Sequence, residues 1–278
     1  MNEPVNTTLP LPPWIHNAQG EPRRIGIEIE MGGLELDAVA ATTAEHFGLT
    51  IAPSGRYERR LHGDPAGEWV VELDFNLLKE MGREPLRERD VFDEVRNTAE
   101  HWLHQAAERV VPVELVSPPL PMSRLPEVES LIGKLRDAGA LGSSERVLYA
   151  FGMQFNPEIP NADIDTLTAY MKAFLCLSDW LVQRVDINMT RRLTTYVDPF
   201  PADYVQRVVD PYYRPSLSVL IDDYLRYNPT RNRALDWLPL FAHLDSQRVA
   251  KVTQDPLIKP RPTLHYRLPN CEIHLPGW

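Results

Sequence analysis

Cysteine, long apolar runs and basic residues are all scarce in this sequence. Its two cysteines, Cys176 and Cys271, are too few for a disulfide framework, so we expect reduced thiols and a cytoplasmic location. The chain has no run of about 18 apolar residues, so we expect no membrane-spanning helix and no membrane partner. A net charge of −10 argues against nucleic acid as a partner, because nucleic-acid binders need a basic face for the phosphates.

Proline is by contrast abundant, with 26 of 278 residues against about 5% in average proteins. Residues 1–22 are polar, contain five prolines and lack an apolar signal core, so we expect a disordered or loosely packed tail. No Gly/Ser-rich linker divides the remainder, and residues 23–278 are therefore expected to form a single domain.

Hydrophobic periodicity predicts an α+β fold, because strands and helices of unequal length follow one another without regular alternation. Strands are predicted at 23–31, 50–57, 68–75, 112–116, 149–156 and 263–268, with a possible continuation at 272–274. A Gly/Asp/Pro turn around 63–67 joins the second and third of these. Helices are predicted at 36–47, 89–109, 125–138, 163–185, 202–209, 216–227 and 234–244.

Five of the predicted strands carry polar side chains on one face and only apolar side chains on the other. Because side chains alternate along a strand, polar residues two positions apart point the same way. These residues are Glu28 and Glu30, Glu72 and Asp74, Glu114, Gln154 and Asn156, and His265 and Arg267. If the strands form one sheet, its apolar face packs on helices and its polar face gathers four or more carboxylates.

Such a gathering predicts a bound divalent cation, since neighbouring carboxylates repel one another unless a proton or a cation intervenes. Carboxylate oxygens are preferred ligands of Mg²⁺ and Mn²⁺, and Mg²⁺ is often shared with the phosphates of a substrate. For any single pair, the alternative is an ordinary solvated face. The basic residues that could contact phosphate oxygens are Arg191, Arg192, Lys259, Arg261 and Arg267.

Five runs of the sequence resemble, in the same order, the amidoligase family. They lie at 24–30 (RIGIEIE), 71–74 (VELD), 114–119 (ELVSPP), 228–236 (NPTRNRALD) and 259–267 (KPRPTLHYR). The family belongs to the carboxylate–amine ligase superfamily of glutamine synthetase and glutamate–cysteine ligase. The resemblance extends over residues 23–270. The Glu-x-Glu strand alone is a weak motif, whereas the ordered set of runs is specific.

The resemblance implies a glutamine synthetase-like catalytic domain, in which a curved antiparallel sheet forms a funnel backed by helices. It implies ATP and two or three Mg²⁺ or Mn²⁺ ions as cofactors. The activity it implies is ATP-dependent ligation of a carboxylate to an amine through an acyl phosphate, giving an amide or isopeptide bond. Carried over to this sequence, Glu28, Glu30, Glu72 and Glu114 are similar to metal ligands, and Arg267 to the phosphate-contacting arginine.

Two positions depart from the superfamily pattern. His265 occupies a position where a Glu is common, and we expect it to bind the metal through one nitrogen without adding negative charge. Gln154 stands where a His is common. The remaining candidates are Asp74, as the acidic residue that deprotonates the amine, and Gln154, Asn156, Arg231 and Arg233, which are expected to bind substrate.

Other interpretations remain open from the sequence. The same carboxylates could activate water in a metal-dependent hydrolase, and a non-catalytic descendant could bind a nucleotide or a partner protein. Small molecules or peptides could supply the carboxylate and the amine. The Gly32–Gly33 pair and the loop 54–67 are either ordinary turns or mobile covers that exclude water. An acidic surface and an aromatic-rich helical half are compatible with both a monomer and a dimer.

Overall fold

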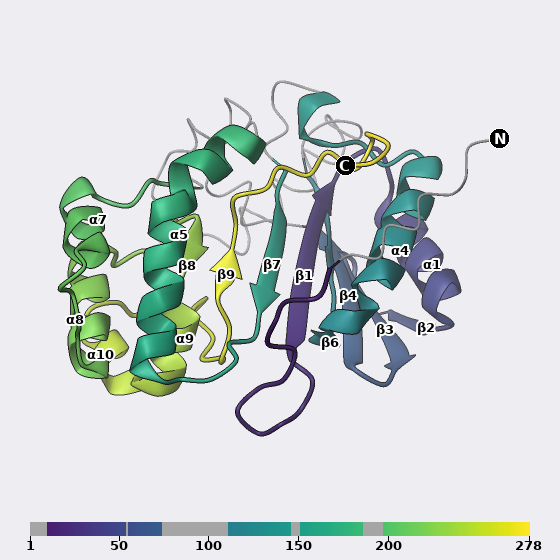
Figure 1. Ribbon diagram of the computed structural model, residues 1–278. Coiled ribbons are helices and arrows are strands. Elements are labelled where there is room, and N and C mark those ends of the chain that lie inside the picture. Colours follow the sequence, from purple (N-terminus) through teal and green to yellow (C-terminus); the bar gives the residue numbers. More distant parts are fainter. Residues whose placement is uncertain (1–9, 54, 74–110, 146–150, 186–196) are drawn as a thin grey trace, which may run out of the picture.

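The protein is described by a computed structural model over residues 10–53, 55–73, 111–145, 151–185 and 197–278. The fold is α+β, as predicted, and is organised by one nine-stranded antiparallel sheet (Figure 1). The strand order is β2-β3-β4-β5-β1-β7-β9-β8, with β6 paired to β1, so the sheet keeps two edges and does not close on itself. The funnel of glutamine synthetase therefore stays a prediction.

The strands differ greatly in length, and the longest lies at the centre of the sheet. They are β1 (Arg24–Met31), β2 (Thr50–Pro53), β3 (Glu58–Asp64), β4 (Gly67–Leu73), β5 (Val113–Val116), β6 (Leu120–Pro121), β7 (Met153–Pro157), β8 (Leu235–Asp236) and β9 (His265–Tyr266). The α-helices in the described residues are α1 (Leu36–Phe47), α4 (Leu125–Asp137), α5 (Ile164–Val185), α7 (Ala202–Val209), α8 (Leu217–Tyr227), α9 (Leu238–Leu244) and α10 (Ser246–Ala250).

Sequence signals explain where several helices begin and end. Gly48, with φ of 68°, ends α1 in the left-handed conformation that glycine adopts without steric cost. The hydroxyl of Ser216 caps α8 by accepting a hydrogen bond from the Val219 amide. A proline in the first turn begins α4, where its missing amide hydrogen is not needed. Within the described residues, no helix has the length and apolarity that crossing a bilayer requires.

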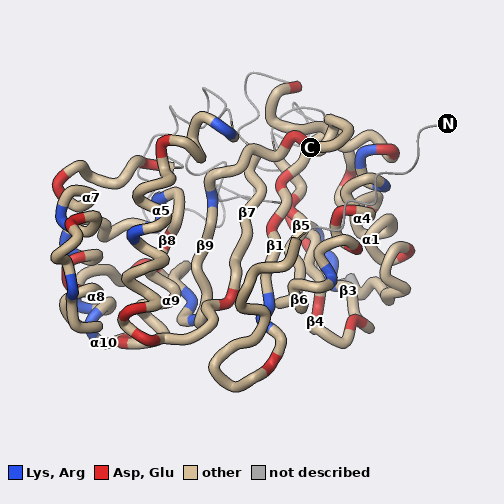
Figure 2. Tube along the Cα trace, viewed as in Figure 1, with Lys and Arg blue, Asp and Glu red and all other residues tan. Residues whose placement is uncertain are grey.

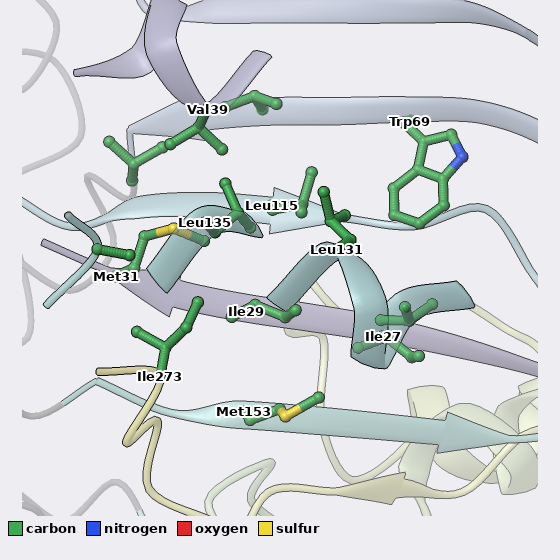
Figure 3. Packing of buried hydrophobic residues seen from close by; sticks show 14 of the residues in the cluster. Ile27, Ile29, Met31, Val39, Trp69, Leu115, Leu131, Leu135, Met153 and Ile273 are labelled. Carbon is green, nitrogen blue, oxygen red and sulfur yellow. The ribbon is translucent and has the colours of Figure 1, made fainter. Parts of the chain in front are cut away.

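The apolar face of the sheet packs on α1 and α4 to form the larger core (Figure 3). Ile27, Ile29 and Met31 point from β1 into this core and are almost completely buried. They meet Leu115 of β5, Trp69 of β4, Val39 of α1, Leu131 and Leu135 of α4, and Ile273 near the C-terminus. Burial of one face of each central strand fixes which side chains must lie on the opposite face.

A second core lies beside the β8 edge of the sheet, where α5 and α7–α10 gather (Figure 1). Its centre consists of buried aromatic side chains in edge or tilted contacts, including Tyr204, Tyr224, Trp237 and Phe241. This core supports the short strands β8 and β9, which have too few ladder hydrogen bonds to be held by the sheet alone. The cysteines are free thiols, Cys176 exposed and Cys271 buried.

Several sequence-based assignments need correction. Residues 58–64 form the strand β3. The turn predicted around 63–67 is shorter than expected, since only residues 65 and 66 connect β3 with β4. The loop 54–67 is thus largely sheet, and Gly32 pairs with Leu141, so neither predicted cover is a free loop. The predicted helix 234–244 is divided into β8 and α9, and the segment 272–274 forms no strand, since a turn begins at Ile273. The predicted helix 89–109 lies outside the described residues.

Candidate functional site

The strand registers place the predicted acidic side chains on one face of the sheet, opposite the core. Glu30 of β1 lies directly across from Glu114 of β5, Glu114 from Glu72 of β4, and Glu72 from Glu58 of β3. We call these four residues the acidic row. Glu28, two residues before Glu30, points the same way and pairs with Gln154 of β7. Carboxylates from four neighbouring strands therefore share one line across the sheet.

Hydrogen bonds fix two of these carboxylates. Glu30 is only 7% exposed, and its carboxylate accepts a hydrogen bond of 2.6 Å from the Gly152 amide. The carboxylate of Glu28 accepts a hydrogen bond of 2.7 Å from the side-chain amide of Asn156. Like charges directly opposed on neighbouring strands destabilise a sheet, so the acidic row costs folding free energy. A feature with this cost is typical of a binding site rather than of a structural element.

The donor chemistry of the row suits a hard divalent cation, because carboxylate oxygens are the ligands that Mg²⁺ and Mn²⁺ prefer. Directly opposed residues have Cβ atoms about 4.5–5.5 Å apart, so glutamate side chains can reach a common ion. In the described part of the chain, however, no three acidic, histidine or cysteine side chains are already arranged around an ion position. The metal site thus stays a prediction, and side-chain rotation would have to accompany binding.

Positive charge gathers at the other end of the same face. Arg267, beside β9, donates hydrogen bonds of 2.6 Å to Oε1 of Gln154 and 3.3 Å to Nδ1 of His265, and lies 3.6 Å from Oδ2 of Asp236. We call Gln154, Asp236, His265 and Arg267 the arginine end. Figure 2 shows the contrast as red segments on β1 and a blue segment on β9. The guanidinium is held by three neighbours and is therefore preorganised.

Burial shifts the pKa values of two groups at the arginine end. Desolvation, with the positive charges of Arg267, Arg261 and Arg231, lowers the pKa of His265 to about 2, so the imidazole stays neutral. Its Nδ1 accepts from Arg267, which places the proton on Nε2. Desolvation raises the pKa of Asp236 to about 6, although Arg267 and Arg231 oppose the shift.

Three buried polar atoms on the strands β7, β9 and β8 have no hydrogen-bond partner among the described residues. They are Oδ1 of Asn156, Nε2 of His265 and Oδ2 of Asp236. Asn156 and His265 are each 4% exposed, and Asp236 is completely buried. An unpaired buried polar atom costs about 1–3 kcal/mol. Such atoms are rare in folded proteins and require an explanation, such as a ligand or ordered water.

The other basic candidates lie in different surroundings. Arg231 is partly buried and faces Asp255 at 4.0 Å, with Arg267 and Asp236 as further charged neighbours. Lys259 and Arg261 are exposed, on the segment that leads into β9. Arg233 is buried, and its guanidinium donates to Oδ1 of Asn228 and to two backbone carbonyls. These contacts give Arg233 a structural role, and its predicted contact with substrate stays a prediction.

Three predicted site residues, Asp74, Arg191 and Arg192, lie outside the described residues. Two residues were not assigned a role from the sequence and join the face only in the structure. Glu58 extends the acidic row, and its carboxylate also accepts from Nε of Arg60 at 2.6 Å. Asp236 completes the arginine end. No local signal marked Asp236, which lies just ahead of Trp237, the N-cap residue of α9, and whose Oδ1 accepts a hydrogen bond from the amide of Leu238 in the first turn of that helix.

Comparison with protein families matches residues 21–278 to the family described as “Putative amidoligase enzyme”. Searches among curated proteins and among solved structures gave no match. The match extends over nearly all of the described structure, including every strand of the polar sheet face. The chain therefore belongs to this amidoligase family, whose described activity is that of a ligase.

Proposed function

We propose that this protein is an ATP-dependent ligase that joins a carboxylate to an amine through an acyl phosphate. Family membership supports a ligase. The observation that carries the finer proposal is the polarity of one sheet face, with opposed carboxylates on β3, β4, β5 and β1 and a fixed guanidinium beside β9. A nucleoside triphosphate with its divalent cation needs both kinds of group, acidic ligands for the cation and a guanidinium for phosphate oxygens.

Within this proposal, Glu28, Glu30, Glu72 and Glu114 hold Mg²⁺ or Mn²⁺ against the phosphates. When bound, the cation neutralises phosphate charge and favours phosphoryl transfer. Glu30 is the best positioned of the four, since its hydrogen bond to Gly152 fixes one oxygen and burial limits its motion. His265 lies among arginines rather than in the acidic row, so its assignment as a metal ligand is the weakest of the set.

Arg267 binds the transferred phosphoryl group in this mechanism. An oxygen of the substrate carboxylate attacks the γ-phosphorus of ATP, and the bond from that phosphorus to the ADP oxygen breaks. The amine nitrogen then attacks the acyl carbon, phosphate leaves, and the amine proton passes to a base, a role predicted for Asp74. The hydrogen bond to Gln154 orients the Arg267 guanidinium before ATP binds, so charge stabilisation requires little reorganisation.

The test is ADP release by the purified protein with Mg²⁺ and ATP, screened over amino acids, short peptides and polyamines. Hydroxylamine is added as the amine, because it converts an acyl phosphate into a hydroxamate that can be quantified. We expect ADP and hydroxamate to appear in equal amounts with at least one carboxylate. Glu30→Gln should reduce both by at least about 100-fold, because it removes a cation-binding charge.

Glu129→Gln is the matched control, because Glu129 is an exposed residue of α4 on the opposite side of the sheet. It should retain full activity. ADP release without hydroxamate would favour a phosphohydrolase, and an unchanged rate in Glu30→Gln would contradict the site assignment.

A further inference from the structure

Helix α5 carries a second apolar face, on the side away from the second core. Residues three or four positions apart lie on one side of a helix. The side that packs into the core holds Leu167, Met171 and Leu175, which are buried. The opposite side holds five exposed residues that we call the α5 stripe, namely Ala169, Ala173, Cys176, Leu177 and Trp180.

The α5 stripe is unusual for a solvent-facing surface. Trp180 is 58% exposed and Leu177 is 50% exposed, although both are large apolar side chains. Helix α5 lies on the outside of the helical half of the molecule, in front of β8 (Figure 1). Single exposed apolar residues are ordinary, but a continuous stripe that includes a tryptophan is typical of a protein–protein interface.

The stripe is arranged symmetrically about the middle of the helix, which spans Ile164–Val185. If two copies of α5 overlap fully in antiparallel orientation, each residue lies opposite the residue that is equally far from the midpoint. Ala169 then faces Trp180 of the second copy, and Ala173 faces Cys176 of the second copy. A small side chain meets a larger one at each of these levels, so the two helices can pack closely.

The charges at the two ends of α5 follow the same symmetry. Asp165 in the first turn and Arg184 in the last turn are both exposed and lie equally far from the midpoint. Antiparallel overlap therefore places Asp165 of each copy opposite Arg184 of the other. The helix dipole favours both charges within a single chain, and antiparallel packing also aligns the two dipoles favourably. Identical faces are thus complementary in charge, as a two-fold dimer requires.

We propose that the α5 stripe is a homodimer interface, in which two copies of α5 pack antiparallel about a two-fold axis at the middle of the helix. This inference goes beyond the proposed function, because it concerns assembly rather than catalysis. A second copy fits this face better than a membrane surface does, since membrane-bound helices carry mainly basic residues beside their apolar face. Among the exposed charged residues of α5, the acidic Asp165 and Asp179 outnumber the basic Arg184.

The first experiment measures the mass of the full-length protein by light scattering and sedimentation, over concentrations from micromolar to near-millimolar. We expect a reversible dimer. Trp180→Glu places charge within the interface and should raise the dimer dissociation constant at least about tenfold, because buried tryptophans carry much of the affinity of such interfaces. Val252→Glu is the matched control, because Val252 is 50% exposed in the turn after α10, and it should dimerise as the native protein does.

Charge reversal tests the antiparallel register. Asp165→Arg or Arg184→Asp alone brings like charges together across the interface and should raise the dissociation constant at least about threefold. The double variant restores opposite charges between the copies and should recover most of the affinity. Within one chain, the double variant opposes the helix dipole at both ends, so a purely structural role would make it worse than either single variant.

Cys176 provides an independent test of proximity at the same interface. Because Cys176 faces Ala173 of the second copy, the two copies of Cys176 are offset by three residues, or about 4.5 Å along the helix axis. A short bismaleimide should therefore join two copies of the native protein. It should not join copies of Cys176→Ser, since Cys271 is buried.

The inference is overturned if the protein is a monomer at every concentration or if Trp180→Glu dimerises as the native protein does, which would place the dimer on another face. It is also overturned if the double charge variant stays as weak as the single variants. A native dimer that the bismaleimide does not join through Cys176 would contradict the antiparallel register.

Discussion

The acidic row and the arginine end occupy the same sheet face but are built in different ways. The acidic row is positioned by long ladders, because β1, β3, β4 and β5 are paired over several residues and anchored by the larger core. At the arginine end, only Gln154 lies on a longer strand, whereas Asp236 and His265 lie on two-residue strands, and side-chain hydrogen bonds together with the helical core hold the group in place. The backbone places the acids, whereas side chains place the arginine.

This difference has an energetic consequence. The acidic row brings like charges together on neighbouring strands, and a bound cation would reduce their repulsion. At the arginine end, Arg267 lies 3.6 Å from Asp236, and beside it Arg231 lies 4.0 Å from Asp255, so these charges are already paired. Cations should therefore change the stability of the protein through the first region, and pH should change it through the second.

The largest expected effect is on turnover, through the geometry of Arg267. Arg267→Lys keeps the positive charge but cannot reproduce the planar fork that contacts Gln154 and His265 together. We expect ADP release to fall by at least about 100-fold, as for loss of a preorganised donor, while the response to Mg²⁺ is retained. Arg248→Lys, at an arginine of α10, is the control and should leave turnover unchanged. Unchanged turnover in Arg267→Lys would remove this residue from the mechanism.

The next effect concerns the buried carboxyl of Asp236. Its pKa is raised from 3.8 to about 6 in the folded protein, so between these pH values the folded state binds more protons than the unfolded state. The free energy of unfolding should fall as pH rises through this window, by about 3 kcal/mol for a two-unit shift. Asp236→Asn lacks the titration, so its stability relative to the native protein should increase from pH 4 to pH 7. Urea denaturation across this range measures the difference, and a constant difference would contradict the burial of Asp236.

A smaller effect is expected from divalent cations at the acidic row. Mg²⁺ or Mn²⁺ at about 100 times its dissociation constant should stabilise the native protein by about 2.7 kcal/mol. In thermal denaturation, each kcal/mol of added stability raises the melting temperature by about 2–4 °C for a chain of roughly this size. Glu114 lies between two other acidic residues, Glu30 and Glu72. Glu114→Gln should therefore abolish most of the rise in melting temperature that the cation causes. If the cation raised the melting temperature of Glu114→Gln as much as that of the native protein, the cation would bind elsewhere.

The sequence predicted the acidic row better than the arginine end, for a physical reason. Strict alternation in 25–31 and 68–73 identifies both faces of a strand, and burial of Ile27, Ile29 and Trp69 confirms the apolar one. The face shared by Glu28, Glu30, Glu72 and Glu114 followed from this period. The pairing order of the strands could not be predicted from this period, because it depends on contacts between distant segments. Glu58 was missed because glycine and proline signals near 63–67 concealed β3.

Asp236 had no role predicted for it because a two-residue strand has no periodicity to detect. Its neighbours Leu235, Trp237 and Leu238 are all buried, which is also typical of an apolar helix, and the segment 234–244 was predicted as one. What distinguishes Asp236 is its fully buried Oδ2, which lies 3.6 Å from Arg267 without a hydrogen bond, and this position arises only when β8, β9 and the helical core come together. Tertiary contacts of this kind are not encoded in local pattern.

The central claim is that the acidic row and Arg267 bind the two halves of one cation–triphosphate complex. The most direct measurement is an anomalous difference map from crystals of the native protein grown with Mn²⁺ and a non-hydrolysable ATP analogue. We expect manganese peaks about 2.0–2.3 Å from carboxylate oxygens of Glu30, Glu72 or Glu114, with phosphate oxygens within hydrogen-bonding distance of Arg267. Manganese bound away from this sheet face, or a triphosphate that does not approach Arg267, would contradict the account.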